Sequence, residues 1–132
     1  MSRTAQEQAN LDLVLAMYRN VLMPMDSTRV DDYISPDYIQ HSSLAEPTVQ
    51  ALKDFLDFVK VQSPEGTHNL KRAFVDGDHV IVHHHVIRHV GDPGLAVVDI
   101  FRVEGGKIVE HWDVLQDVPE APVNPQIGRA SC

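Results

Sequence analysis

The sequence predicts an α+β domain in which a curved antiparallel sheet wraps around N-terminal helices and one internal cavity. Three observations support this fold class. Apolar residues recur at helical spacing in the first half of the chain, alternating strand-like runs fill the second half, and turn residues separate those runs. With 132 residues, the chain is long enough for one domain with a sizeable core. We therefore expect residues 1–132 to form a single domain, with 119–132 as a proline-containing tail.

The first helix is expected from Thr4 to Met23. Thr4 can cap it, and Glu7 three residues later completes a capping box, while Pro24 ends it. The apolar stripe that repeats at helical spacing is Leu11, Leu15, Tyr18 and Leu22.

Two more helices and a short strand are expected before residue 63. Asp26 or Ser27 can cap a short second helix, which Ser35-Pro36 breaks. Tyr38–His41 then reads as a short strand, and Pro47 suits the first turn of a third helix. The apolar stripe of this third helix is Val49, Leu52, Phe55, Leu56 and Val59.

The second half of the chain predicts consecutive strands joined by turns. The first runs from His68 to Val75 and the second from His79 to Val90. The turn residues Asp76-Gly77-Asp78 lie between these two strands, and a second turn at 91–94 follows the second strand. A hairpin then follows from Leu95 to Gln116.

The turn of this hairpin decides which residues share a face. A two-residue Gly105-Gly106 turn would place Asp99 on the same face as Trp112. A three-residue turn over 104–106, with a left-handed glycine in a bulge, would place Asp99 opposite His111. We favour the second, because a type I turn followed by a left-handed glycine suits Glu-Gly-Gly better.

One face of the hairpin then combines apolar and ionisable side chains, namely Asp99, Phe101, Val109, His111 and Asp113. A carboxylate in a buried strand is unfavourable unless it is paired, hydrogen-bonded or neutral. This face resembles a cavity wall with polar groups; the alternative is that both aspartates serve only local hydrogen bonds or a subunit contact.

Two sequence words carry a family resemblance: YIQHSS at Tyr38–Ser43 and VVDIFRVEGGKIVEHWDVLQ at Val97–Gln116. They resemble the SnoaL-like polyketide cyclase group, which belongs to the nuclear-transport-factor-two-like superfamily. That superfamily also contains ketosteroid isomerase, scytalone dehydratase and limonene epoxide hydrolase. The order of predicted elements fits as far as Val118. The resemblance implies a cone-shaped sheet around a cavity, but no single reaction, since this fold hosts many chemistries.

The resemblance also implies roles for individual residues. Asp99 and Tyr18 fall where ketosteroid isomerases hold their oxyanion-hole Asp and Tyr, the Asp being kept neutral. His41 stands where those isomerases carry the basic Asp. Asp113 falls where SnoaL-type cyclases carry the acid/base Asp, while Asp99 replaces their partner His. The chain thus keeps one carboxylate from each relative.

Other chemistries find weaker support. His83 and His85 alternate on one strand face as two metal ligands would, and His41, His68 or His111 could supply a third. The sequence lacks H-E-x-x-H, cupin spacing, a G-x-S-x-G elbow and a glycine-rich phosphate loop. We therefore expect neither a metal nor another cofactor.

These observations favour a cofactor-independent lyase or isomerase that moves protons on a small carbonyl compound, as in an aldol-type step. Asp113 is the expected general base and later acid. Asp99, as the neutral donor, would stabilise the enolate oxygen with Tyr18, and His41 or His111 would orient substrate or shuttle a proton. The residues expected to contact substrate are Phe101, Trp112, His83, His85 and Phe55. The alternatives are a non-catalytic binding protein and a hydrolase or dehydratase that activates water with Asp99 and Asp113.

Composition limits the partners. The net charge of −8 and the lack of a Lys/Arg cluster argue against nucleic acid. No apolar run is long enough for a membrane span or a signal peptide, and Cys132 is the single cysteine, so we expect a cytoplasmic protein without internal disulfides. Both faces of the strand from His79 are apolar or carry histidine, which predicts a homodimer that covers the outer face of the sheet.

Overall fold

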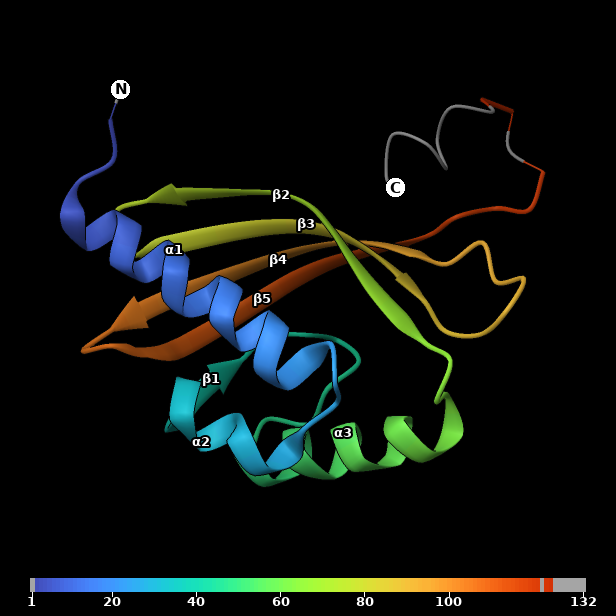
Figure 1. Ribbon diagram of the computed structural model, residues 1–132, viewed down its shortest axis with the longest axis horizontal. Coiled ribbons are helices and arrows are strands. Elements are labelled where there is room, and N and C mark those ends of the chain that lie inside the picture. The colour runs from blue at the N-terminus through green and yellow to red at the C-terminus, as the bar shows by residue number, and fades with distance from the viewer. Residues whose placement is uncertain (1, 122, 125–132) are drawn as a thin grey trace.

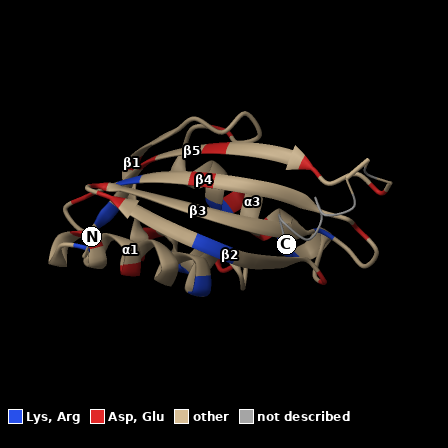
Figure 2. Ribbon diagram, turned by 90° about the horizontal axis from the view of Figure 1, so that it is seen from above, with Lys and Arg blue, Asp and Glu red and all other residues tan. Residues whose placement is uncertain are grey.

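The computed structural model describes residues 2–121, 123 and 124, and it has the α+β architecture that the sequence predicts. Three α-helices lie on one side of a curved five-stranded sheet (Figures 1 and 2). The helices are α1 (Ala5–Met17), α2 (Val30–Tyr33) and α3 (Val49–Gln62). The strands are β1 (Ile34–Gln40), β2 (Thr67–Asp76), β3 (His79–Ile87), β4 (Leu95–Glu104) and β5 (Lys107–Asp117), in the spatial order β1-β5-β4-β3-β2.

Helix α1 begins as predicted and ends differently. Thr4 accepts a hydrogen bond from the Glu7 backbone, and the Glu7 carboxylate accepts one from the Thr4 backbone, which completes the capping box. After Met17 the helix widens into one π-helical turn over Tyr18–Leu22, closed by the bond from Met23 N to Tyr18 O. Such turns are rare and often lie at functional sites. Here the turn carries Tyr18, which is fully buried.

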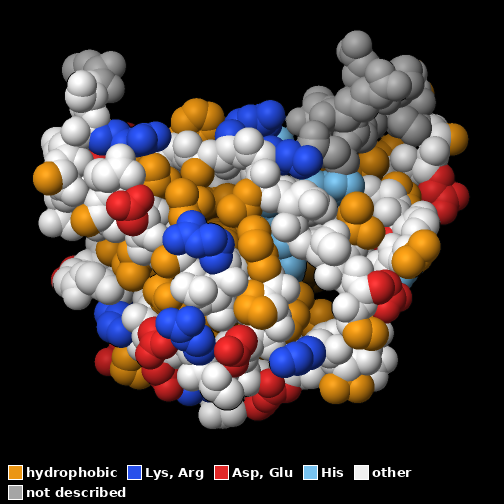
Figure 3. All heavy atoms as spheres, in the orientation of Figure 1, with side chains coloured by type: hydrophobic (Ala, Val, Ile, Leu, Met, Phe, Trp, Pro, Cys, Tyr) orange, Lys and Arg blue, Asp and Glu red, His pale blue; other side chains and the backbone are white. Residues whose placement is uncertain are grey.

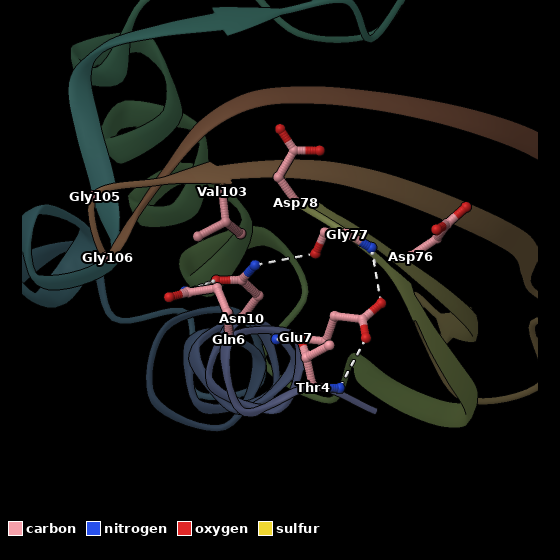
Figure 4. Close-up of a pocket in the computed structure, with 10 residues that line it drawn as sticks. All are labelled: Thr4, Gln6, Glu7, Asn10, Asp76, Gly77, Asp78, Val103, Gly105 and Gly106. Carbon is pink, nitrogen blue, oxygen red and sulfur yellow. Dashed lines mark hydrogen bonds between the residues drawn. The ribbon is translucent and has the colours of Figure 1, made fainter. Parts of the chain in front are cut away.

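The start of α1 is tied to the turn between β2 and β3 beside a surface groove of about 830 Å³ (Figure 4). Glu7 accepts a hydrogen bond from the Gly77 backbone at 2.9 Å, and Asn10 donates to the Gly77 carbonyl at 3.2 Å. Gly77 has a left-handed backbone (φ 61°), which glycine adopts without strain. These contacts give the polar groups of the groove a structural role.

The sheet is mixed, which corrects the prediction of a wholly antiparallel one. β2, β3, β4 and β5 form antiparallel pairs, but β1 pairs with β5 in parallel. A parallel neighbour far apart in sequence leaves no local signal, because one helix and three strands separate β1 from β5 along the chain. β1 also starts at Ile34 and includes Ser35-Pro36, which we expected to lie between elements. Proline is tolerated there because β1 is an edge strand.

The predicted three-residue turn of the last hairpin is wrong. Glu104 pairs with Lys107, and Gly105 and Gly106 form the turn alone, both with positive φ (59° and 76°). A type I′ turn requires positive φ at both central residues, and two glycines supply it. The register then shifts, because Arg102 pairs with Glu110 while Val103 pairs with Ile108. The extra residue, Val109, restores the predicted face for Asp99, Phe101, His111 and Asp113. Val109 itself does not line the cavity as expected, since Ile108 does, and Asp99 pairs with Asp113 and not with His111.

Two other boundaries move. Pro47, expected in the first turn of the third helix, precedes α3, and Thr48 caps the helix by accepting a hydrogen bond from the Ala51 backbone. β3 ends at Ile87, three residues before the predicted end. Most of the tail 119–132, including Cys132, lies outside the described residues. In the part of the chain that the structure describes, no helix is long and apolar enough to cross a membrane.

Candidate functional site

A cavity of about 480 Å³ lies between the helices and the inner face of the sheet. Its walls are mostly apolar, and Figure 3 shows histidine side chains between hydrophobic ones near the middle of this side of the molecule. The ionisable or amide side chains that line it are Tyr38, Gln40, His68, His84, Arg88, Asp99, His111 and Asp113. An apolar cavity with a few convergent polar groups is the usual form of a small-molecule site.

The polar groups form a row across four strands. Asp99 on β4 lies directly opposite Asp113 on β5, and His111 lies two residues away on the same face. On β3, Val82 pairs with Asp99, so His84 is diagonal to that carboxylate. On β2, His68 pairs with Val86, the next inward residue of β3 after His84. The row therefore runs from His68 to Asp113 across the inner face.

Asp99 is the centre of a hydrogen-bond network. Its Oδ2 atom accepts from the Tyr18 hydroxyl and from His84 Nε2, the latter at 2.6 Å. Its Oδ1 atom accepts from His111 Nε2 at 2.8 Å. The Asp99 side chain is 8% exposed and the His84 side chain 4%. Three donors on one buried carboxyl group match the ionised form, which has only acceptor atoms.

The network therefore contradicts the expectation that Asp99 is the neutral donor of the site. Burial alone raises the pKa of Asp99, but hydrogen bonds from His111 and His84 and the charges of those rings outweigh it and hold the pKa well below its usual range. Burial and the adjacent Asp99 carboxylate raise the pKa of Tyr18 well above its usual value, which keeps its hydroxyl protonated. Because Tyr18 donates to Asp99, neither residue has a proton free for a substrate oxygen.

His111 is held at both ring nitrogens. Nε2 donates to Asp99, and Nδ1 lies 2.6 Å from Gln40 Oε1. The orientation of the Gln40 amide is fixed, because its Oε1 atom also accepts from the Ser42 backbone at 3.0 Å. Two acceptors around one imidazole are both satisfied when the ring carries two N–H groups and a positive charge. Asp99 and Gln40 together fix the orientation of this ring in the cavity wall.

Asp113 differs from Asp99 although the two are cross-strand partners. Its carboxylate lines the cavity, is partly buried, and makes no hydrogen bond with any residue that the structure describes. It adds to the negative charge that raises the pKa of Tyr18. A carboxylate with free lone pairs in an apolar cavity can accept a proton from a bound ligand.

The structure places only some of the predicted site residues at the cavity. Asp99, His111, Asp113 and Phe101 line it, as does Phe55, which is 54% exposed. Tyr18 reaches it through Asp99.

Four predicted residues, His41, Trp112, His83 and His85, lie on the other face of the sheet, so their predicted site roles are not supported by their positions. His41 pairs with Glu110 at 2.7 Å and stacks on Trp112 with ring centroids 5.0 Å apart. His83 contacts Arg72, and His85 lies 2.6 Å from the Pro93 carbonyl. The alternation of strands explains this, since Tyr38 and Gln40 of β1 and His84 of β3 are the inward residues.

Sequence reasoning missed His84 and Gln40 as members of the site and treated His68 only as a spare metal ligand. A usable signal was present for His84, which alternates with Val80 and Val82, the most apolar positions of its strand. An Asp99 that points inward requires a polar partner from that same face of β3. Gln40 alternates with Tyr38 in the same way, but its neighbour His111 comes from the parallel pairing.

Three side chains of the site are also arranged as the ligands of a metal ion would be. Asp99, His111 and Asp113 each offer one ligand atom, and these atoms lie within 4.8 Å of one another. Such a set of carboxylates and imidazole suits a divalent transition metal. However, Asp99 and His111 are already bonded to each other, and a metal would have to replace that bond. The expected absence of a metal stays a prediction, which elemental analysis of the purified protein tests.

The fold and the cavity together define a small α+β protein built around a ligand-sized site. The chain belongs to the SnoaL-like domain family, whose model matches residues 14–111. A comparison with curated proteins finds no match.

Solved structures agree on the fold. A proposed polyketide cyclase from Acidithiobacillus ferrooxidans superposes with a TM-score of 0.69 at 19% identity, over 87% of this chain and 91% of that one. A proposed SnoaL-like polyketide cyclase from Jannaschia sp. CCS1 gives 0.71 at 14% identity, over 87% and 90%. IdmH, a proposed polyketide cyclase from Streptomyces antibioticus, gives 0.65 at 20% identity, over 80% and 91%. At these identities the likeness establishes the fold alone.

Proposed function

We propose that this protein is a cofactor-independent acid/base enzyme that acts on a small carbonyl compound, with Asp113 as the general base. The observation that carries the proposal is the contrast between the two paired carboxylates. Asp99 accepts three hydrogen bonds, whereas Asp113 faces the apolar cavity without a protein partner among the described residues. The group that is free to move a proton is therefore Asp113.

The proposed reaction begins when the Asp113 carboxylate removes a proton from the carbon next to the substrate carbonyl. The C–H electron pair forms an enolate, and the enolate carbon then takes the proton back from Asp113 or attacks a second carbonyl carbon of the same substrate. In the second case Asp113 returns its proton to the new alkoxide oxygen. No electron is gained or lost overall, so the reaction needs no redox partner.

His111 is the group that we propose for stabilising the enolate. It lies near Asp113 on the same face of β5, and it carries a positive charge when both ring nitrogens donate, one to Asp99 and one to Gln40. A preorganised charge stabilises developing negative charge in a low-dielectric site. Asp99 holds the His111 ring in place. Tyr18 and His84 in turn hold Asp99, which gives Tyr18 a positioning role instead of the direct oxyanion contact expected from sequence.

The alternatives have less support. A hydrolase that activates one water between two carboxylates needs both of them, but Asp99 is already occupied by three donors. A binding protein without turnover would use the same apolar walls and needs no free base. The test is a direct measurement of proton exchange, in D₂O, at the carbon next to the carbonyl of a methyl ketone that binds the protein. Binding without deuterium incorporation would favour the binding protein.

We further propose a homodimer through the outer face of the sheet, and a cytoplasmic location remains a prediction. Four apolar side chains lie side by side across the strands of that face: Phe74, Ile81, Ile100 and Trp112. Phe74 is 56% exposed and Val114 is 64% exposed. Such a continuous apolar row on a face that none of the described helices covers favours association.

A further inference from the structure

His68 lines the cavity but takes no part in the network around Asp99. Both of its ring nitrogens are buried, and neither has a hydrogen-bond partner among the described residues. Its ring stacks on that of His84, with centroids 5.8 Å apart and an interplanar angle of 18°. The faces of the two rings therefore lie against each other, while the ring nitrogens of His68 make no hydrogen bond to any described residue. A buried polar group without a partner is unfavourable and calls for an explanation.

The surroundings keep this imidazole uncharged. Burial and the adjacent His84 ring lower the pKa of His68 to about 4, against a small opposite effect of Asp99. A neutral imidazole offers one N–H donor and one acceptor nitrogen. It therefore suits a hydroxyl or carbonyl group better than a carboxylate or phosphate.

The charged side chains of the cavity also favour a neutral ligand. Arg88 is the only lysine or arginine among the residues that line it, and its guanidinium is bound to Asp92 at 2.7 and 3.0 Å. Asp113 adds an unpaired negative charge. His111, the ring proposed to stabilise the enolate, is bonded to Asp99. Arg88 and His111 thus both already face a carboxylate, and the site favours a neutral ligand over an anionic one.

The position of His68 sets the separation between the two ends of such a ligand. His68 is on β2 and Asp113 is on β5, three strands apart in the sheet order. With neighbouring strands about 4.8 Å apart, their backbones are separated by ~14 Å across the strands. The register places His68 level with Asp117, which adds an offset of four residues, about 13 Å, along the strand direction. The walls between them are mostly apolar, through residues such as Val86, Val97 and Phe101.

We propose that His68 binds a second polar group, a hydroxyl or carbonyl, at the far end of an elongated, neutral and otherwise apolar substrate whose reacting carbonyl lies at Asp113. This inference rests on the proposed function, since it assumes that a carbonyl compound occupies the cavity. It adds a substrate class, because a simple monofunctional ketone would leave His68 unbonded.

The test compares two ligand series that differ by one hydroxyl. Methyl ketones of increasing chain length are titrated into the protein by calorimetry, beside ω-hydroxy methyl ketones of the same lengths. At the length that spans the cavity, the hydroxyl should tighten binding about three- to tenfold, as one neutral hydrogen bond does. In His68→Phe, which keeps a stacking ring, this advantage should vanish while the plain ketone binds as before. His68→Gln should keep part of it.

His83→Phe is the matched control, because it removes a histidine from the adjacent strand on the opposite face, and it should keep the full advantage. Ring-nitrogen NMR shifts of His68 should change with the hydroxy ketone and not with the plain ketone. Equal binding of both series to the parent protein, or an unchanged advantage in His68→Phe, would overturn the inference and leave the proposed function standing. Failure of both series to bind would overturn the proposed function, and the inference with it.

Discussion

Asp99 and Asp113 are direct cross-strand partners on β4 and β5, yet Asp99 accepts three hydrogen bonds and Asp113 accepts none from the residues that the structure describes. Two carboxylates this close disfavour each other's ionisation unless one is compensated. The donors Tyr18, His84 and His111 compensate Asp99 alone. The pair is thereby divided into a fixed structural anion and a group available for proton transfer.

The structural role of Asp99 predicts a large loss of stability in Asp99→Asn. The amide would present an NH₂ group to side chains that are themselves donors, so one or two of the three hydrogen bonds would be lost inside the protein. Breaking a buried charge network of this kind costs about 3–5 kcal/mol. Urea unfolding measures the change. Asp78→Asn is the control, since that side chain is 60% exposed and should change stability by less than about 0.5 kcal/mol. A loss below about 1 kcal/mol for Asp99→Asn would contradict the network.

His68 predicts how stability depends on pH. The pKa of His68 is about 4 in the folded protein, against 6.5 for a histidine in the unfolded chain. The unfolded chain therefore binds the proton more readily. Protonation of His68 thus favours the unfolded chain. Its contribution to the free energy of unfolding is fully present above pH 6.5 and is lost as the pH falls from 6.5 to 4. The shift corresponds to roughly 3 kcal/mol across that range.

His68→Phe cannot be protonated and should show a flatter curve over the same interval. Unfolding free energies of both proteins, measured by urea titration at several pH values, give the comparison. The neighbouring His84 and Asp99 are present in both proteins, so the difference between the curves isolates His68. Parallel curves would show that His68 is not held neutral.

Much of the fold is readable from the sequence because its signals are local. The Thr4–Glu7 capping box marks the start of α1, and alternation on β4 and β5 marks the inner face that holds Asp99 and Asp113. The type of the hairpin turn was not readable, because Glu104-Gly105-Gly106 is compatible with either turn and the compensating bulge has no distinct sequence pattern. The predicted face was nevertheless correct for His111 and Asp113, because the two-residue turn and the bulge together shift the register there by two positions, and wrong for Val109, which is the bulged residue.

The polar network was less predictable because it depends on pairings between distant segments. His41 was expected at the cavity, but the parallel register of β1 on β5 turns Gln40 inward instead. The protonation of Asp99 was also misjudged. Burial alone favours a neutral carboxyl, and only the positions of His84 and His111 reverse that preference. A count of donors around a buried acid requires the three-dimensional structure.

The outer face of the sheet predicts a dimer in solution. Sedimentation velocity at micromolar concentration should show a dimer. Phe74→Glu, which places a charge in the exposed apolar row, should shift the protein toward monomer without unfolding it. Phe58→Glu is the matched control, because Phe58 is 63% exposed on α3 and lies outside that row. A parent protein that sediments as a stable monomer would contradict the dimer.

The central claim is that Asp113 moves protons on a bound carbonyl compound, and Asp113→Asn tests it most directly. The substitution keeps the shape of the side chain and removes its basicity. Because Asp113 makes no hydrogen bond within the described part of the chain, stability should change little. Asp117→Asn on the same strand, at a side chain that is 80% exposed, is the control and should keep the activity of the parent.

The measurement is the rate of deuterium incorporation from D₂O next to the carbonyl of a methyl ketone that binds the protein, followed by NMR. The account predicts that Asp113→Asn lowers this rate by about a hundred- to ten-thousand-fold while the compound still binds. Exchange at the parent rate in Asp113→Asn would contradict it.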